Sequence, residues 1–109
     1  MLVGSFGVAT GAASAWGSCN TSGRVCLFRN TSGSVELGWR SAGGGLVNIS
    51  SGNRNEMSSW KNSSGTNAAY YHGLNGGGTC RTMSANSNSN YVGDSNNDQA
   101  ESWRTNRGC

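Results

Sequence analysis

The sequence predicts an all-β domain in which two four-stranded units pack as a sandwich. Residues 24–66 align without a gap on residues 67–109, and a fixed internal period indicates one structural unit used twice. The chain contains 18 glycines and no long stretch with helical periodicity. Its apolar residues form short runs between turns rich in Gly, Asn and Ser, as is typical of antiparallel strands.

The matches between the two repeats fall at positions that organise a fold. Gly33 aligns with Gly76, and we expect both to supply the positive φ that a tight fold-back requires. Two Ser-Trp pairs, which end at Trp60 and Trp103, also align. Because neither repeat could bury its apolar face alone, we expect these tryptophans to fill the two halves of one core.

Each repeat is expected to contain four strands. Those of the first repeat are 24–29, 34–39, 46–49 and 57–61, and those of the second are 69–72, 79–83, 91–92 and 100–104. The strand that ends at Trp39 alternates with a period of two, which is typical of a half-buried strand, and we expect this tryptophan to be partly exposed. Eight short antiparallel strands with one inward face each make a two-sheet sandwich.

Composition and charge narrow the class of function. A chain of 109 residues has room for one domain with a modest core. Its net charge of +3 is too small and too scattered to predict a nucleic-acid surface. No segment is long enough to cross a membrane. We therefore expect a monomer that binds neither nucleic acid nor membrane.

Residues 1–15 differ from the rest of the chain. They carry no charge and end in Ala13-Ser14-Ala15, a pattern of the kind that signal peptidase cuts. A basic n-region and a longer apolar core are missing, so we interpret residues 1–15 as the remnant of a signal peptide that starts upstream. The mature protein, residues 16–109, would then be secreted, with Trp16 on a mobile leader. An ordinary flexible N-terminus is the alternative.

Four cysteines, an even number in a short chain, predict a disulfide framework. Cys19 and Cys26 bracket a short loop, and we expect them to pair. Pairing Cys80 with Cys109 would tie the C-terminal strand back to the sheet. Zinc is the competing interpretation, but these separations match no zinc-ligand spacing. Disulfides agree with secretion.

Several residues and their spacings resemble the motifs of two known protein families. An aromatic residue such as Phe28, a turn glycine five residues later and a downstream Ser-Ser-Trp resemble a βγ-crystallin Greek key. Two such motifs in tandem imply a βγ-crystallin-like β-sandwich stapled by disulfides. The opening Cys19-x6-Cys26 and residues 55–62 resemble more closely the secreted bacterial metalloproteinase inhibitors of peptidase inhibitor family 36.

The second resemblance implies an inhibitor of a peptidase, with a metalloproteinase as the expected target, and no enzymatic activity. Such inhibitors present a rigid exposed loop, because preorganisation lowers the entropy cost of binding. In the family the reactive bond lies in a loop closed by a local disulfide, whereas Cys80 has no near cysteine partner. The candidates nearest by position are Asn75 and Gly76 in a turn, and Cys80 and Arg81 beyond it. A plain hairpin turn and strand are the alternative.

Calcium binding is implied by the βγ-crystallin resemblance. Many such domains carry Asn/Asp-Asn/Asp-x-x-Ser/Thr-Ser, whose oxygen atoms suit calcium. The candidate ligands are Asn55 and Ser58 in the first copy and Asn97, Asp98 and Glu101 in the second. The simpler interpretation is that Ser59 and Ser102 hydrogen-bond the folded hairpin while Asn55 and Asp98 cap a turn. We expect no other cofactor.

Other classes of function have weaker support. His72 is the only histidine, and a surface imidazole is its plain interpretation. The five acidic residues show no spacing that selects a glycosidase pair. A secreted interaction module, adaptor or toxin-like protein remains an alternative, with Trp16 as an anchor that docks into a partner.

Overall fold

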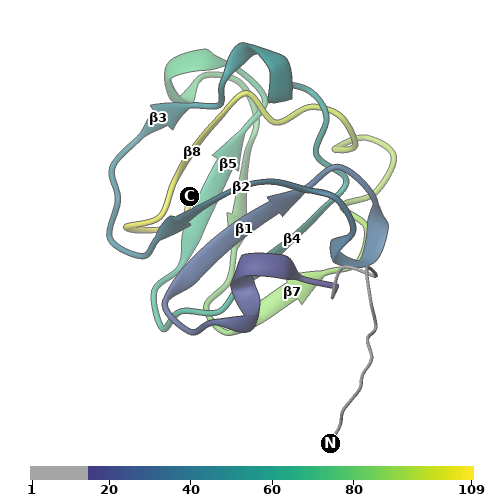
Figure 1. Cartoon of the computed structure of the whole chain (residues 1–109). Helices are drawn as coiled ribbons and strands as arrows, with labels where there is room; N and C mark the ends of the chain where they lie inside the picture. Colours follow the sequence, from purple (N-terminus) through teal and green to yellow (C-terminus); the bar gives the residue numbers. More distant parts are fainter. Residues whose placement is uncertain (1–14) are drawn as a thin grey trace, which may run out of the picture.

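The computed structural model describes residues 15–109, which form two four-stranded antiparallel sheets (Figure 1). The first sheet has the order β2-β1-β4-β7 and the second β3-β8-β5-β6. The strands are β1 Arg24–Phe28, β2 Glu36–Ser41, β3 Val47–Asn48, β4 Ser59–Asn62, β5 Ala68–Tyr71, β6 Cys80–Met83, β7 Ser87–Ser89 and β8 Ser102–Arg104. The predicted all-β sandwich is confirmed.

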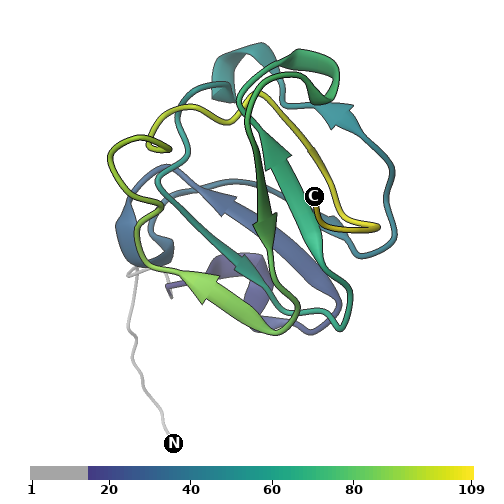
Figure 2. The same ribbon diagram turned by 180° about the vertical axis from the view of Figure 1, so that it is seen from behind.

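Each sheet contains three strands from one repeat and one strand from the other: β7 of the second repeat joins the first sheet, and β3 of the first repeat joins the second sheet. β3 follows β2 in the chain but pairs with β8, where Val47 lies opposite Trp103. β7 follows β6 but pairs with β4, where Ser89 lies opposite Trp60. Figure 2 shows the two sheets from behind, with the light-green β7 at the outer edge of the first sheet. These exchanges are the Greek-key connections, and they make each sheet depend on both repeats.

The core lies between the two sheets and contains side chains from both repeats. Trp60 is 9% exposed and Trp103 is 5% exposed, so the prediction that both fill the core is confirmed. The other buried members of this core are Val25, Leu27, Ile49, Met57, Ala68, Tyr70, Met83 and Ala100.

A second apolar cluster covers the outer face of the first sheet. It contains Cys26 and Phe28 of β1 together with Cys19, which is bonded to Cys26. Trp16 packs edge-on against Phe28 with the ring centroids 5.6 Å apart, and its backbone N–H donates to the Gly33 carbonyl at 2.9 Å. The prediction that Trp16 lies on a mobile leader is therefore wrong, because its ring covers an apolar face of the protein.

Both predicted disulfides are present. Besides Cys19–Cys26, the bond between Cys80 and Cys109 ties the end of the chain to β6, with the two Cα atoms 5.9 Å apart. Residues 1–14 of the predicted signal-peptide remnant lie outside the described residues. Within residues 15–109, no helix has the length and apolar character that crossing a bilayer requires.

The position of β7, the strand that the second repeat contributes to the first sheet, differs from the predicted position. It lies at Ser87–Ser89, where Asn62 of β4 pairs with Ser87, whereas the sequence predicts residues 91–92. Ser and Asn favour turns by propensity, but pairing with a neighbouring strand overrides that preference. Tyr91 is instead 43% exposed, and its hydroxyl donates to Asp94 at 2.6 Å. The other strands agree with their predicted ranges to within two residues at each end.

The two repeats fold the same turn after their first strands. These turns are η3 (Thr31–Gly33) and η5 (Leu74–Gly76), in which Ser32 and Asn75 have φ values of 56° and 57°. Gly33 and Gly76 follow with φ values of 72° and 74°, so the predicted positive φ is confirmed. A side chain at either glycine would be strained.

Candidate functional site

Ser102 holds the η5 turn against the end of β8. Its buried hydroxyl accepts a hydrogen bond from the Gly76 N–H at 3.0 Å and donates one to the Gly73 carbonyl at 2.7 Å. Ser59 makes the same pair of bonds with the η3 turn in the first repeat. The interpretation that both serines hydrogen-bond a folded hairpin is confirmed.

The η5 turn has a second attachment, which comes from the other repeat. The Asn75 N–H donates to Asn48 Oδ1 at 2.7 Å, and Asn48 Nδ2 donates to Asn75 Oδ1 at 3.1 Å. Asn48 lies in β3, the strand that the first repeat contributes to this sheet. The turn is thereby fixed by backbone and side-chain hydrogen bonds at both of its candidate residues, Asn75 and Gly76.

Exposed apolar side chains surround this turn. Leu74, at the start of η5, is 41% exposed, and Leu46 and Val47 on the neighbouring β3 segment are 38% and 42% exposed. The first repeat has Thr31 at the position equivalent to Leu74, so the η3 turn is polar at that position, and the exposed apolar side chain near it is Val35, which lies beyond the turn. We call Leu46, Val47 and Leu74 the η5 surface.

Cys80 and Arg81 do not lie in this turn. Both belong to β6, where Cys80 pairs with Tyr71 of β5 and is bonded to Cys109. Arg81 is exposed, and its Nε donates to Asn96 Oδ1 at 3.0 Å. The candidate inhibitory residues therefore separate into a hydrogen-bonded turn and a paired strand.

The candidate calcium ligands meet across the two repeats. The Ser58 hydroxyl donates to Asn97 Oδ1 at 2.5 Å, and Asn55 Nδ2 donates to Glu101 Oε2 at 2.9 Å. Asp98, like Asn55, has a positive φ. No group of three or more His, Cys, Asp or Glu side chains suited to a metal is found among residues 15–109. These pairs supply oxygen atoms but few carboxylates, which favours the hydrogen-bonding interpretation.

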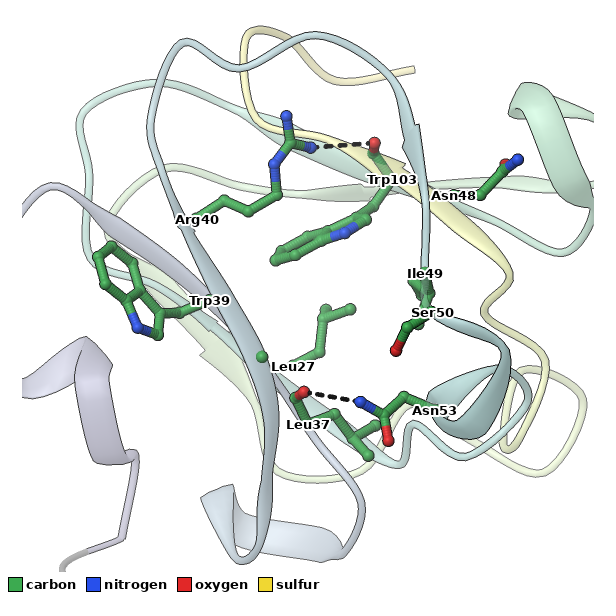
Figure 3. Close-up of a pocket in the computed structure, with 10 residues that line it drawn as sticks. Leu27, Leu37, Trp39, Arg40, Asn48, Ile49, Ser50, Asn53 and Trp103 are labelled. Atoms are coloured by element: carbon green, nitrogen blue, oxygen red, sulfur yellow. Dashed lines mark hydrogen bonds between the residues drawn. The ribbon is translucent and has the colours of Figure 1, made fainter.

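A pocket of about 230 Å³ opens between β2 and β3, at one end of the space between the sheets. Figure 3 shows Leu27 below the Trp103 ring, Leu37 farther down beside Asn53, the Arg40 guanidinium above the ring and the Trp39 side chain directed away. We call this the β2–β3 pocket.

Comparison with known proteins decides the family. The sequence profile described as peptidase inhibitor family I36 matches residues 12–83, which is well over half of the chain. The chain belongs to peptidase inhibitor family I36. This confirms the family that the cysteine spacing and residues 55–62 indicate.

Solved structures similar to this I36 member are βγ-crystallin domains. The domain from Clostridium beijerinckii is 24% identical with a TM-score of 0.59, and the similarity covers 73% of this chain and 93% of that one. The domain from Flavobacterium johnsoniae is 21% identical with a TM-score of 0.60, over 73% and 90%. A structure described under the evolution of the eye lens βγ-crystallin domain fold is 18% identical with a TM-score of 0.63, over 88% and 91%. These similarities show the fold. No curated protein matches the sequence.

Membership of the I36 family implies that the binding partner is a peptidase. The family and the two disulfides are consistent with an extracellular location. The Trp16 ring, which the sequence offers as an anchor for a partner, packs on Phe28 within the protein.

His72 of this I36 member is half-buried, which corrects the expectation of a plain surface imidazole. It stacks on Tyr70 with the ring centroids 6.1 Å apart, and within residues 15–109 its buried Nε2 has no hydrogen-bond partner. Burial lowers the pKa of His72, the positive charge of Arg81 lowers it further, and the nearby Asn96 side chain opposes both effects.

Sequence reasoning missed two features near these sites. Asn48 is an ordinary polar residue in the sequence, and only strand exchange places it against Asn75. Val35 has a φ of 59° and is 54% exposed, an unusual conformation for a β-branched residue. The repeat alignment contains a signal for it, because Val35 aligns with Gly78, whose φ is 70°.

Proposed function

We propose that this I36 family member inhibits a secreted metalloproteinase by inserting the η5 surface into the active-site cleft. One observation carries the proposal: Leu74 is exposed on a turn that hydrogen bonds from both repeats hold in place. Rigid loops lose little conformational entropy on binding, and an apolar side chain at the tip fills a specificity pocket.

The two repeats differ in a way that favours the second turn as the binding element. Thr31 and Leu74 occupy equivalent positions on η3 and η5. The η3 turn is polar at this position, whereas the η5 turn adds Leu74 to the exposed Leu46 and Val47. Apolar side chains gathered on an exposed surface mark an interaction site more often than single ones do.

A metalloproteinase is the class of peptidase we propose as the target. The tandem repeat, the Cys19–Cys26 bond and the candidate export segment all agree with the secreted metalloproteinase inhibitors that the sequence resembles. In this proposal the protein acts as a secreted monomer without catalytic turnover.

Titration of the purified protein against a thermolysin-like enzyme and a serine protease tests the proposal. We expect stoichiometric inhibition of the metalloenzyme alone, with the added protein remaining intact. Leu74→Ala should weaken inhibition by at least about tenfold, which corresponds to about 1.4 kcal/mol. Thr31→Ala, the same truncation at the equivalent position of η3, is the matched control and should leave inhibition unchanged.

Two results would favour the alternative of an interaction or adaptor module. One is the absence of inhibition at micromolar protein, and the other is simple digestion of the protein as a substrate. Inhibition that Leu74→Ala and Thr31→Ala reduce equally would keep the inhibitory activity but remove the η5 turn as its source.

Calcium binding is a second candidate function, favoured by the contact of the two motif copies across the repeats. The pairs Ser58–Asn97 and Asn55–Glu101 bring hydroxyl, amide and carboxylate groups together, and calcium binds oxygen atoms of these kinds. A bound calcium ion would replace the hydrogen bonds within these pairs.

A further inference from the structure

The β2–β3 pocket has an apolar interior to which both repeats contribute. Leu27, Leu37, Ile49 and the indole of Trp103 line it. Gly38 also lines it, and a Cβ atom built on this glycine would meet nothing within 4 Å. The missing side chain of this glycine is therefore part of what opens the pocket.

The second repeat carries larger residues at the equivalent positions. Leu27 corresponds to Tyr70, which is 2% exposed, and Gly38 corresponds to Arg81. Because Leu27 and Gly38 lie opposite each other in the pairing of β1 with β2, their side-chain directions fall on the same face of the sheet. A leucine and a glycine thus leave space in the first repeat where the second has a phenol ring and a long side chain.

Arg40 places a positive charge at the edge of this apolar space. Its carbon Cζ lies 5.3 Å from the Trp103 ring centroid. Nη1 donates to the Trp103 carbonyl at 3.2 Å, and Nη2 donates to the Gly45 carbonyl at 2.6 Å. Arginine has five N–H donors, so three remain for a ligand.

No carboxylate compensates this charge among the described residues. The ion pair found there joins Arg29 to Glu56, and the residues that line the pocket include no acid. Burial lowers the pKa of Arg40, which agrees with a guanidinium partly removed from water. A partly desolvated cation beside an apolar cavity attracts an anion that carries an apolar group.

We propose that the β2–β3 pocket binds a small free carboxylate with a single aromatic ring, with the ring against Trp103 and the carboxylate on Arg40. The volume of about 230 Å³ lies below the range of about 300–1,000 Å³ for drug-sized ligands, so the ligand is correspondingly small. The planar carboxylate matches the fork of N–H groups on a guanidinium. Asn48 lines this pocket and also holds the η5 turn, but ligand binding in the pocket is measured independently of the inhibition proposed for that turn.

The test uses 3-phenylpropionate and the full chain labelled with ¹⁵N for NMR titration. We expect saturable shifts of the Trp103 indole N–H and the Asn53 side-chain amide, which both come from residues that line the pocket. The indole N–H of Trp60, at the equivalent position of the other repeat, should stay in place. 3-Phenylpropan-1-ol, which keeps the ring but lacks the charge, should bind at least about tenfold more weakly.

Gly38→Leu fills the pocket and should abolish saturable binding. The added side chain meets open space, and the φ of Gly38 lies outside the region that favours glycine, so we expect the variant to fold. Gly65→Leu is the matched control, because this glycine also has open space around it and does not line the pocket. It should bind 3-phenylpropionate like the parent.

Three results would overturn the proposal. The first is a lack of saturable shifts at Trp103, and the second is equal affinity for the acid and the alcohol. Both of these are measured on the parent protein and do not depend on how a variant folds. The third is tighter binding of N-acetyl-Ala-Ala-Phe, a peptide with a free C-terminal carboxylate, than of 3-phenylpropionate, because it would assign the pocket to a peptide end.

Discussion

Asn48 of the first repeat and Asn75 of the second exchange two hydrogen bonds, at 2.7 and 3.1 Å. The pair joins β3 to the η5 turn, two segments that lie far apart in the sequence. It therefore makes the conformation of the proposed inhibitory turn depend on the exchange of strands between the repeats.

Asn48→Ala should weaken inhibition without removing any exposed apolar side chain. The variant frees the Asn75 N–H and lets the turn sample other conformations, so binding must order it again at a cost of about 0.5–1.5 kcal/mol or more. We expect inhibition to weaken by about three- to tenfold with a small change in melting temperature, measured by inhibitor titration and thermal denaturation. Asn88→Ala, on the exchanged strand of the other repeat, is the control and should inhibit like the parent.

Trp60→Ala and Trp103→Ala should each lower the free energy of unfolding by about 3–5 kcal/mol, because each leaves a large cavity in the core. Trp39→Ala is the comparison. Trp39 is 41% exposed and stacks under the Arg24 guanidinium at 4.0 Å, so its loss should cost about 1 kcal/mol or less. Urea denaturation measures all three, and equal midpoints for parent and core variants would contradict the assigned core.

Acid should destabilise the protein through His72. Its pKa is lowered in the folded state, whereas an unfolded chain titrates near its ordinary value of about 6.5. Below that value the unfolded state binds more protons than the folded state, so stability is lost as the pH falls from about 6.5 toward the folded-state pKa.

Unfolding free energies measured between about pH 7.5 and pH 5, a range that includes the ordinary pKa of about 6.5, check this prediction. His72→Gln keeps a polar side chain that does not titrate, so its stability should vary less over the same range. An identical pH dependence for the variant and the parent would show that other groups cause the loss.

Calcium, if it binds the two motif copies, should raise the melting temperature through its preference for the folded state. The comparison is between melts in millimolar calcium and in chelator. Ser58→Ala removes one candidate ligand hydroxyl and should reduce the shift, while Ser87→Ala, whose hydroxyl bonds the Ser84 carbonyl on the surface, should not. Identical melts in both conditions would leave the motif pairs with a structural role only.

The elements that depend on local chemistry and on repetition could be predicted from the amino-acid sequence. The alignment of Gly33 with Gly76 predicted two equal turns with positive φ, and the structure confirms them. Short apolar runs between turn residues predicted the all-β sandwich, and cysteine spacing predicted both disulfides. These features follow from covalent and steric preferences that neighbouring residues already contain.

Features that depend on contacts between distant residues became visible only in the folded protein. β7 forms at Ser87–Ser89 because these residues pair with the free edge of β4. The Trp16 ring packs against Phe28 because the outer face of the first sheet is apolar. The contact of Asn48 with Asn75 likewise exists only because the repeats exchange strands. Pairing edges, apolar faces and exchanged strands are properties of the folded assembly, and no local sequence pattern encodes which distant residues will supply them.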